Sequence, residues 1–226
     1  MHFSLTFFLF FRLRKQFAQV SRQKKWKFAW TSIPILDFND CKFFNDDTEE
    51  ESTAWHFVKF VGRVLSLHDA FFITKFILCC ELEHKPSCIR SWVSATIMCN
   101  VEELDTSIPD SDSVSLPHCL YACGRLKVLK LGGPFVLTVP TLVCLNSLKI
   151  VSLCGVQISN CFSLKKLLPG CPLVDELEIR YSWTNAKTLH ISSVSLEKLK
   201  REKLLMCANS NTTGCGIVID TKFEVS

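Results

Sequence analysis

Cysteine and histidine are the residue types with the most chemical potential in this sequence of 226 residues, which contains 13 cysteines and 6 histidines. Their thiols and imidazoles could form disulfides, bind a transition metal, or act together as nucleophile and base. The cysteine count is odd, and Cys79, Cys80, Cys144 and Cys154 lie inside apolar runs. A disulfide-stabilised secreted domain carries an even number at regular spacings in a short chain. We therefore predict free thiols that pack as small hydrophobic groups in a reducing compartment, the cytoplasm or the nucleus.

The spacing of these residues favours neither a metal site nor catalysis. A structural zinc site uses two closely spaced ligand pairs, whereas Cys119 and Cys123, beside His118, form the one candidate pair in this sequence. His68 and His84 have neighbours typical of surface loops. The sequence contains no glycine-rich phosphate loop and no nucleophile elbow. We predict no metal, no cofactor and no catalytic residue, and an enzyme is the weakest of the functional hypotheses.

Charge and hydropathy do not indicate a nucleic-acid or membrane partner. The formal net charge is +4, and the basic residues are clustered only within residues 12–27. Nucleic-acid binding needs a continuous basic face that neutralises phosphates. The apolar run from Phe3 to Phe11 is far shorter than the roughly 20 residues that span a bilayer. It also lacks the preceding positive charge and the cleavage site of a secretory signal. We predict no contact with nucleic acid or membrane.

An apolar pattern of the form apolar-x-x-apolar-x-apolar recurs from residue 73 onwards, and this is the strongest structural signal. Successive copies start 28, 25, 22 and 26 residues apart, and all four intervals fall within the 20 to 29 residues of leucine-rich repeats. In the second copy Thr106 replaces the last apolar residue. The pattern becomes irregular after Arg180. The copies begin at Ile73, Val101, Leu126, Leu148 and Val174.

The geometry of this pattern predicts how the repeats are built. Its last two apolar residues are two positions apart, so they point to the same side of a short strand. One repeat cannot bury its apolar side alone, but a row of repeats forms a parallel sheet over a continuous core. Residues 86–95 and 163–170 have the apolar spacing of helices, with Ser163 as an N-cap. We predict an α/β leucine-rich-repeat solenoid, with strands on a concave face and irregular helices on the convex face. A compact α/β domain remains an alternative, although it would not repeat one consensus.

Five stretches of the sequence resemble a known family: residues 26–38, 57–68, 89–94, 128–133 and 168–177. The first stretch is similar to the Trp-Thr-Ser-x-Pro-x-Leu-Asp-Phe block at the end of the F-box in plant F-box/leucine-rich-repeat proteins of the FBD type, which have RNI-like repeats. The resemblance implies a non-catalytic substrate receptor of a cullin-RING ubiquitin ligase. In such a receptor the F-box docks on a Skp-type adaptor, which joins it to the cullin, and the repeats hold a protein target.

The resemblance and the repeat geometry predict two sets of binding residues. Residues 1–17 do not match the Leu-Pro-rich start of an F-box, so we expect an incomplete F-box preceded by a divergent segment, and we recognise no C-terminal FBD segment. The resemblance places adaptor contacts at Val20, Trp26 and Trp30. Residues that flank the buried strand positions should face a target on the concave side. These are Lys130, Ser152, Glu178, Arg180 and His190.

The predicted organisation has five parts: a divergent apolar and basic N-terminus (1–17), the remnant of the F-box (18–40), an acidic linker (41–56), leucine-rich repeats (57–205) and an irregular tail (206–226).

The alternative function is a protein-interaction module made of repeats alone, or a degenerate member of the F-box family without a ligase.

Overall fold

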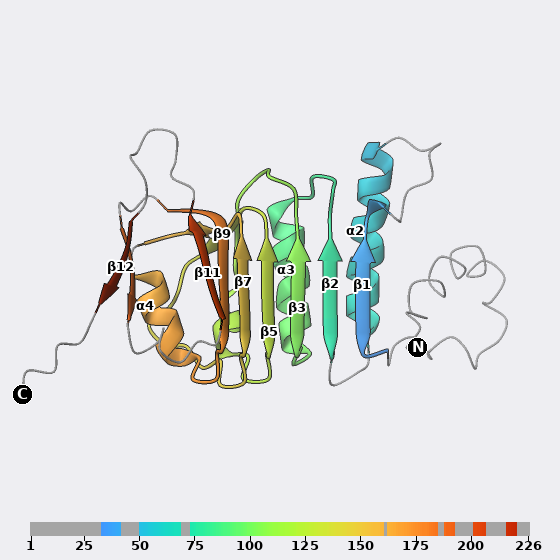
Figure 1. Cartoon of the computed structure of the whole chain (residues 1–226). Coiled ribbons are helices and arrows are strands. Elements are labelled where there is room, and N and C mark those ends of the chain that lie inside the picture. Colours follow the sequence, from blue (N-terminus) through green and yellow to red (C-terminus); the bar gives the residue numbers. More distant parts are fainter. Residues whose placement is uncertain are drawn as a thin grey trace, which may run out of the picture.

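The computed structural model describes residues 33–41, 50–68, 73–160, 162–184, 188–192, 201–206 and 216–220 (Figure 1). Side chains are described for residues 33–41, 54–68, 73–160 and 162–180.

A parallel sheet forms the centre of the part of the chain that the structure describes, and its strands lie side by side in chain order (Figure 1). Every neighbouring pair in this row is parallel, because the chain crosses back behind the sheet after each strand. We call the face of this sheet that points away from helices α2 and α3 the strand face. The strands are β1 (Ile35–Asn39), β2 (Lys75–Cys79), β3 (Glu103–Ser107), β5 (Val128–Gly132), β7 (Ile150–Cys154), β9 (Glu176–Thr184) and β11 (Arg201–Met206).

The register of the sheet confirms the predicted repeats. The fourth position of each sequence copy forms one straight row across the sheet, and every residue in that row is buried. The row consists of Phe76, Leu104, Leu129, Val151 and Leu177. The last position forms a second buried row, in which the Thr106 hydroxyl donates a hydrogen bond to the Lys130 carbonyl at 3.4 Å. That bond explains how a polar side chain replaces an apolar one there. The coarse prediction of an α/β leucine-rich-repeat fold with parallel strands is thus confirmed.

The sheet begins one strand earlier than the sequence pattern indicated. Strand β1 pairs with β2 along its whole length, so Leu36 and Phe38 extend the two buried rows. The Phe38 ring contacts Phe60 and Phe76, with centroid separations of 6.0 and 5.7 Å. The interval from Leu36 to Phe76 is longer than the 20 to 29 residues of the other repeats. Because of this longer spacing, the first strand lies outside the periodic pattern of the sequence.

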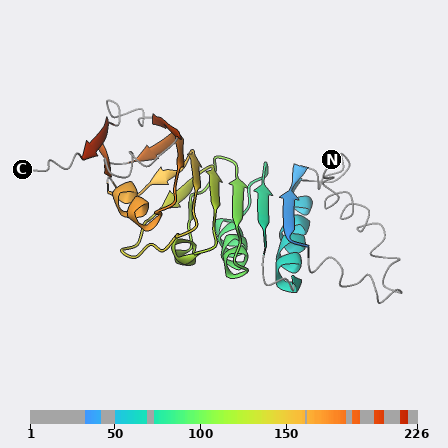
Figure 2. The ribbon, with the colours of Figure 1, turned by 60° about the horizontal axis from the view of Figure 1, so that its bottom comes forward.

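Helices cover the other face of the sheet, and they shorten along the chain (Figure 2). The segment between β1 and β2 contains α2 (Glu50–Leu67), and the next contains α3 (Pro86–Met98), as predicted for residues 86–95. Phe57 on α2 and Trp92 on α3 meet edge to face at 6.0 Å beneath the sheet. Burying rings of this size stabilises the fold by roughly 1.5–3 kcal/mol each.

Later crossovers contain shorter helices. Between β3 and β5 lies η3 (His118–Ala122), and between β7 and β9 lie α4 (Ser163–Leu167) and η4 (Leu168–Gly170). The prediction that Ser163 is the N-cap was wrong, since Phe162 occupies that position and Ser163 is buried in the first turn. The Asn160 side chain instead accepts a hydrogen bond from the Phe162 backbone N–H at 3.0 Å.

A second, shorter ladder runs beside the main sheet. It consists of β4 (Val114–Ser115), β6 (Phe135–Leu137), β8 (Gln157–Ile158) and residues 183–184 of β9, so β9 belongs to both ladders. Turns with left-handed glycines join the two: Gly133 has φ 105° and Gly155 has φ 71°. The Gly133 N–H donates to the Cys154 carbonyl, and the Gly155 N–H to the Arg180 carbonyl. The glycine turns therefore stack in the same register as the strands.

Gly62 offers a test of the helix packing. It lies inside α2, and a methyl group added there would meet no atom within 4 Å. We expect Gly62→Ala to raise the free energy of unfolding by about 0.5–1 kcal/mol, because alanine loses less backbone entropy in a helix. Urea denaturation of the full chain measures this change. A decrease in the free energy of unfolding would contradict the finding that α2 has room for a methyl group at Gly62.

Candidate functional site

Polar side chains cross the middle of the strand face in one connected row. Strands β3, β5, β7 and β9 are in register, so their central outward residues are direct neighbours: Asp105, Lys130, Ser152 and Glu178. Arg180 lies two residues further along β9 on the same face. We call these five residues the polar row. Successive side chains of a strand point to opposite faces, and the described neighbours of these residues along each strand are buried, so these five side chains point outward.

Hydrogen bonds and ion pairs join the members of the polar row in two groups. The Ser152 hydroxyl donates to Glu178 Oε2 at 3.2 Å, and an Arg180 guanidinium NH2 donates to the same oxygen at 3.3 Å. Arg180 Nε lies 3.1 Å from Glu178 Oε1, and Lys130 Nζ lies 3.9 Å from Asp105 Oδ2. Half-exposed pairs of this kind contribute about 0–1 kcal/mol each to folding. Their main effect is to orient charged groups on a surface that is open to a partner.

A second group of charges lies where the strands begin. Glu102 accepts hydrogen bonds from Lys127 and Arg125, and these bonds lower the pKa of its carboxyl group below the usual value. On the strand face itself, Lys75 Nζ pairs with Glu103 Oε2 at 3.1 Å. Acidic and basic side chains thus alternate over this part of the surface, which carries both signs of charge.

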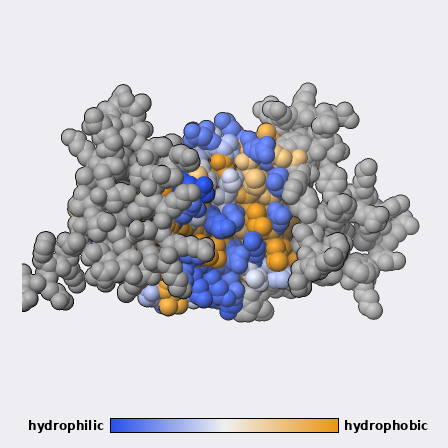
Figure 3. Space-filling view, in the orientation of Figure 1, coloured by the Kyte–Doolittle hydropathy of each residue, from blue (hydrophilic) through white to orange (hydrophobic). Residues whose placement is uncertain are grey.

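Apolar side chains lie between these charges. Ile77, Val128 and Ile150 are half-buried at outward positions of β2, β5 and β7. Figure 3 views the strand face and shows polar and apolar groups intermixed across it. Cys79 and Cys154 are also half-buried at outward strand positions, and Cys144 is half-buried as well, so of the four cysteines predicted to pack as buried groups the prediction holds for Cys80 alone. Non-obligate protein–protein interfaces are about as apolar as the rest of a protein surface, so this mixture of groups is compatible with such a contact.

The structure brings together four of the five residues predicted to contact a target. Lys130, Ser152, Glu178 and Arg180 all belong to the polar row. His190 lies on β10 (Thr188–Ser192), which pairs with β12 (Gly216–Asp220) in a separate two-stranded sheet. The residues predicted to contact an adaptor, Val20, Trp26 and Trp30, lie outside the described residues.

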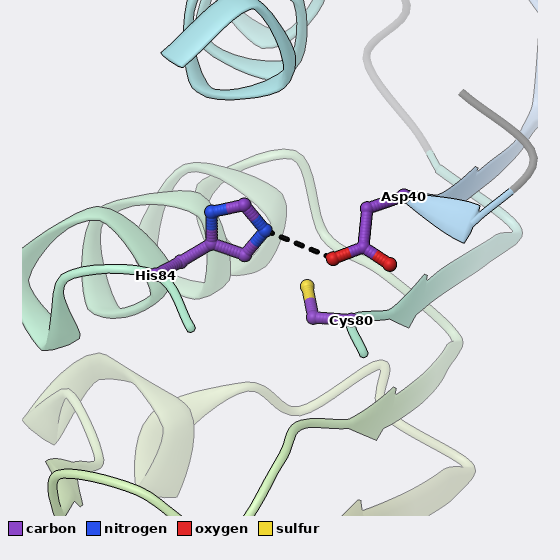
Figure 4. A group of neighbouring side chains, drawn as sticks. All are labelled: Asp40, Cys80 and His84. Carbon is purple, nitrogen blue, oxygen red and sulfur yellow. Dashed lines mark hydrogen bonds and ion pairs between the residues drawn. The ribbon is translucent and has the colours of Figure 1, made fainter. Parts of the chain in front are cut away.

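A buried ionisable pair joins the first strand to the second repeat. Asp40 directly follows β1 and is fully buried; one of its carboxylate oxygens lies 3.0 Å from Nε2 of His84 (Figure 4). His84 was predicted to lie on the surface, and this was wrong: its side chain is 1% exposed. The imidazole stacks on Phe57 at 5.2 Å and contacts Trp92 edge to face at 5.9 Å. No local sequence signal links Asp40 and His84, because 44 positions separate them.

Asp40 organises the turn that follows β2. Its two oxygens accept hydrogen bonds from the backbone N–H groups of Glu81 (2.9 Å) and Leu82 (3.1 Å). Burial alone would raise the pKa of Asp40, but the hydrogen bonds from His84 and from these two N–H groups together hold it below 3.8. A carboxylate in this position can therefore stay ionised and accept all three bonds. Nδ1 of His84 has no partner among the described residues, and an ionised Asp40 accepts the hydrogen bond that Nε2 donates.

The thiols of the described residues are free. Burial raises the pKa of Cys171 to about 12, and it also raises the pKa of Cys80 and Cys123. Cys119 and Cys123, the pair considered for zinc, differ in environment: Cys119 is exposed and Cys123 is buried. Burial disfavours the thiolate form and hence nucleophilic reactivity.

None of the helices that the structure describes has both the length and the apolar character needed to cross a membrane.

Comparison with known proteins places the repeats in a family. The family model for the leucine-rich repeats of FBD-associated F-box protein At5g56370 matches residues 89–213. The chain belongs to this family of plant FBD-associated F-box proteins with leucine-rich repeats. The match includes β3 to β11, and hence the whole polar row. The family resemblance predicted from sequence is therefore confirmed.

Relatives from Arabidopsis thaliana support the same assignment. F-box protein At4g09920 is 33% identical over 204 residues, which cover 89% of this chain and 62% of that protein. FBD-associated F-box protein At4g10400 is 34% identical over 180 residues, with coverages of 78% and 42%. Putative FBD-associated F-box protein At5g56440 is 31% identical over 179 residues, with coverages of 78% and 40%. The chain thus spans between about two fifths and three fifths of the length of these relatives. No solved structure matches it.

Proposed function

We propose that this chain is a non-catalytic substrate receptor of a cullin-RING ubiquitin ligase and binds a protein target on the strand face of its repeat solenoid. The polar row is the observation that carries this proposal, because it presents oriented charges of both signs beside half-buried aliphatic groups. Membership of a family whose relatives are named F-box proteins supports the link to a ligase. The mixture of charges does not favour nucleic acid, which would require a basic face.

The proposed receptor would act by positioning alone. Target binding would hold lysines of the target close to the ubiquitin-carrying subunits, and a Skp-type adaptor would connect the receptor to the cullin.

The free cysteines of the described residues support a reducing compartment, either cytoplasm or nucleus.

Ser152→Arg tests the proposed target surface. Ser152 is half-buried at the centre of the polar row, so an arginine there would obstruct a partner while remaining able to pair with Glu178. We expect the variant to keep its fold and to lose target capture at least tenfold in proximity labelling of the full chain, a loss of roughly 1.4 kcal/mol or more in binding. Arg90→Glu is the matched control, because Arg90 is exposed on α3 behind the sheet.

The same experiment separates the alternatives. Equal labelling of all partners by Ser152→Arg and the unmodified chain would contradict binding on the strand face. Capture of a target without any Skp-type adaptor or cullin would contradict the ligase link and would indicate a protein-interaction module made of repeats alone.

A further inference from the structure

Three side chains that could bind a metal through different atoms meet just beyond the ends of strands β1 and β2. Asp40 follows β1, Cys80 follows β2, and His84 precedes α3, and all three residues are buried (Figure 4). A carboxylate oxygen, a sulfur and an imidazole nitrogen from these residues all lie within 4.8 Å of one another. Side chains from three separate segments thus converge on one buried point.

The Cys80 thiol is an independent indication of a ligand. Its sulfur points toward the hydrogen-bonded His84 and Asp40 side chains (Figure 4), and no hydrogen bond to it is found among the described residues. The Asp40 carboxylate, in contrast, is held by two backbone N–H groups, and the imidazole is held between Phe57 and Trp92. The two groups that could bind a metal through oxygen and nitrogen are therefore fixed in orientation by their surroundings. The third, the buried Cys80 thiol, faces them without a hydrogen-bond partner among the described residues.

The donor set selects the chemical class of ligand. Sulfur and imidazole nitrogen together with one carboxylate suit Zn²⁺, whereas Ca²⁺ and Mg²⁺ require oxygen donors. The charges also balance, because a divalent cation is neutralised by one carboxylate and one thiolate. This balance matters at a buried position, where an uncompensated charge is costly. Cys41 adds a further sulfur nearby, with its Sγ 3.5 Å from Asp40 Oδ1.

We propose that Asp40, Cys80 and His84 form a buried binding site for a zinc ion that links the first strand to the second repeat, with water in the fourth position around the metal. On binding, Cys80 releases its thiol proton to solvent and its sulfur bonds the metal. His84 loses the proton on Nε2 to solvent and takes one up from solvent on Nδ1, and the Nε2 lone pair bonds the metal in place of the hydrogen bond to Asp40. One Asp40 oxygen completes the three protein bonds, while the N–H groups of Glu81 and Leu82 keep the carboxylate in place.

Cobalt titration of the tag-free, reduced full chain tests the site. Co²⁺ replaces Zn²⁺ at such sites and gives thiolate-to-metal absorption bands. We expect Cys80→Ser to bind one equivalent fewer than the unmodified chain and to lose the corresponding part of the absorption. Cys119→Ser is the matched control, since Cys119 is exposed and on η3, and it should keep both. Identical stoichiometry and absorption in Cys80→Ser and the unmodified chain would overturn the proposal.

A second measurement does not depend on the variant folding. Zinc added to the chelator-treated unmodified chain, at about 100 times its dissociation constant, should raise the melting temperature by about 5–10 °C. An unchanged melting temperature at saturating zinc would overturn the proposal. Both measurements are independent of target binding on the strand face, so the failure of one proposal leaves the other in place.

Discussion

Replacing Asp40 with alanine should lower the free energy of unfolding by about 3–5 kcal/mol, measured by urea denaturation of the chelator-treated full chain. The variant leaves the N–H groups of Glu81 and Leu82 and Nε2 of His84 without their acceptor inside the protein. Each of these donors lost its water on folding, so the cost of leaving it unpaired is not recovered. Chelation ensures that the measurement reports on the hydrogen bonds and not on a bound ion.

Two variants bracket this result. Asp40→Asn keeps one carbonyl oxygen as an acceptor and should lose less stability than Asp40→Ala. Asp110→Ala removes an exposed aspartate and should change stability by no more than about 0.5 kcal/mol. If Asp40→Ala were as mild as Asp110→Ala, the Asp40–His84 pair would not hold the first strand to the second repeat.

Gly133→Ala should cost roughly 3 kcal/mol of stability. Two effects combine at this position. Gly133 has φ 105°, a conformation that disfavours every residue with a Cβ atom. A methyl group would also collide with the carbonyl oxygen and the side chain of Ile108 in the neighbouring repeat. Thermal unfolding should show a melting temperature lower by about 6–12 °C, given the size of the chain.

Gly124→Ala is the control for that variant. Gly124 lies outside the left-handed region, and a methyl group there meets nothing within 4 Å. We expect it to be neutral within about 0.5 kcal/mol. Equal effects of the two substitutions would contradict the stacked glycine turns.

The repeats could be predicted well from the sequence because the buried positions of each repeat lie close together in the chain. Each copy contains its own pair of buried strand residues, and the register aligns Phe76 with Leu104 and Leu129. The outward positions of Lys130, Ser152 and Glu178 follow from the same alternation. These features depend only on spacing within about six residues.

Features that depend on distant partners could not be read from the sequence. The first strand was missed because α2 lengthens its crossover. The burial of His84 depends on Asp40, Phe57 and Trp92, none of which is a sequence neighbour. The second ladder consists of strands of two or three residues, too short to show alternation.

The second ladder has a consequence for how the molecule unfolds. Repeat arrays behave as one-dimensional chains in which stability depends on nearest-neighbour coupling. From β3 to β9, each pair of repeats is coupled by both ladders, whereas the described residues around β1 and β2 have no second ladder and are coupled to their neighbours by the main sheet and by the contacts behind it, such as Phe57–Trp92 and Asp40–His84. Hydrogen exchange should therefore find a cooperative unit spanning β3 to β9, with β1 and β2 opening at lower free energy. The β1–β2 end of the array would then open while the strands from β3 to β9 stay folded.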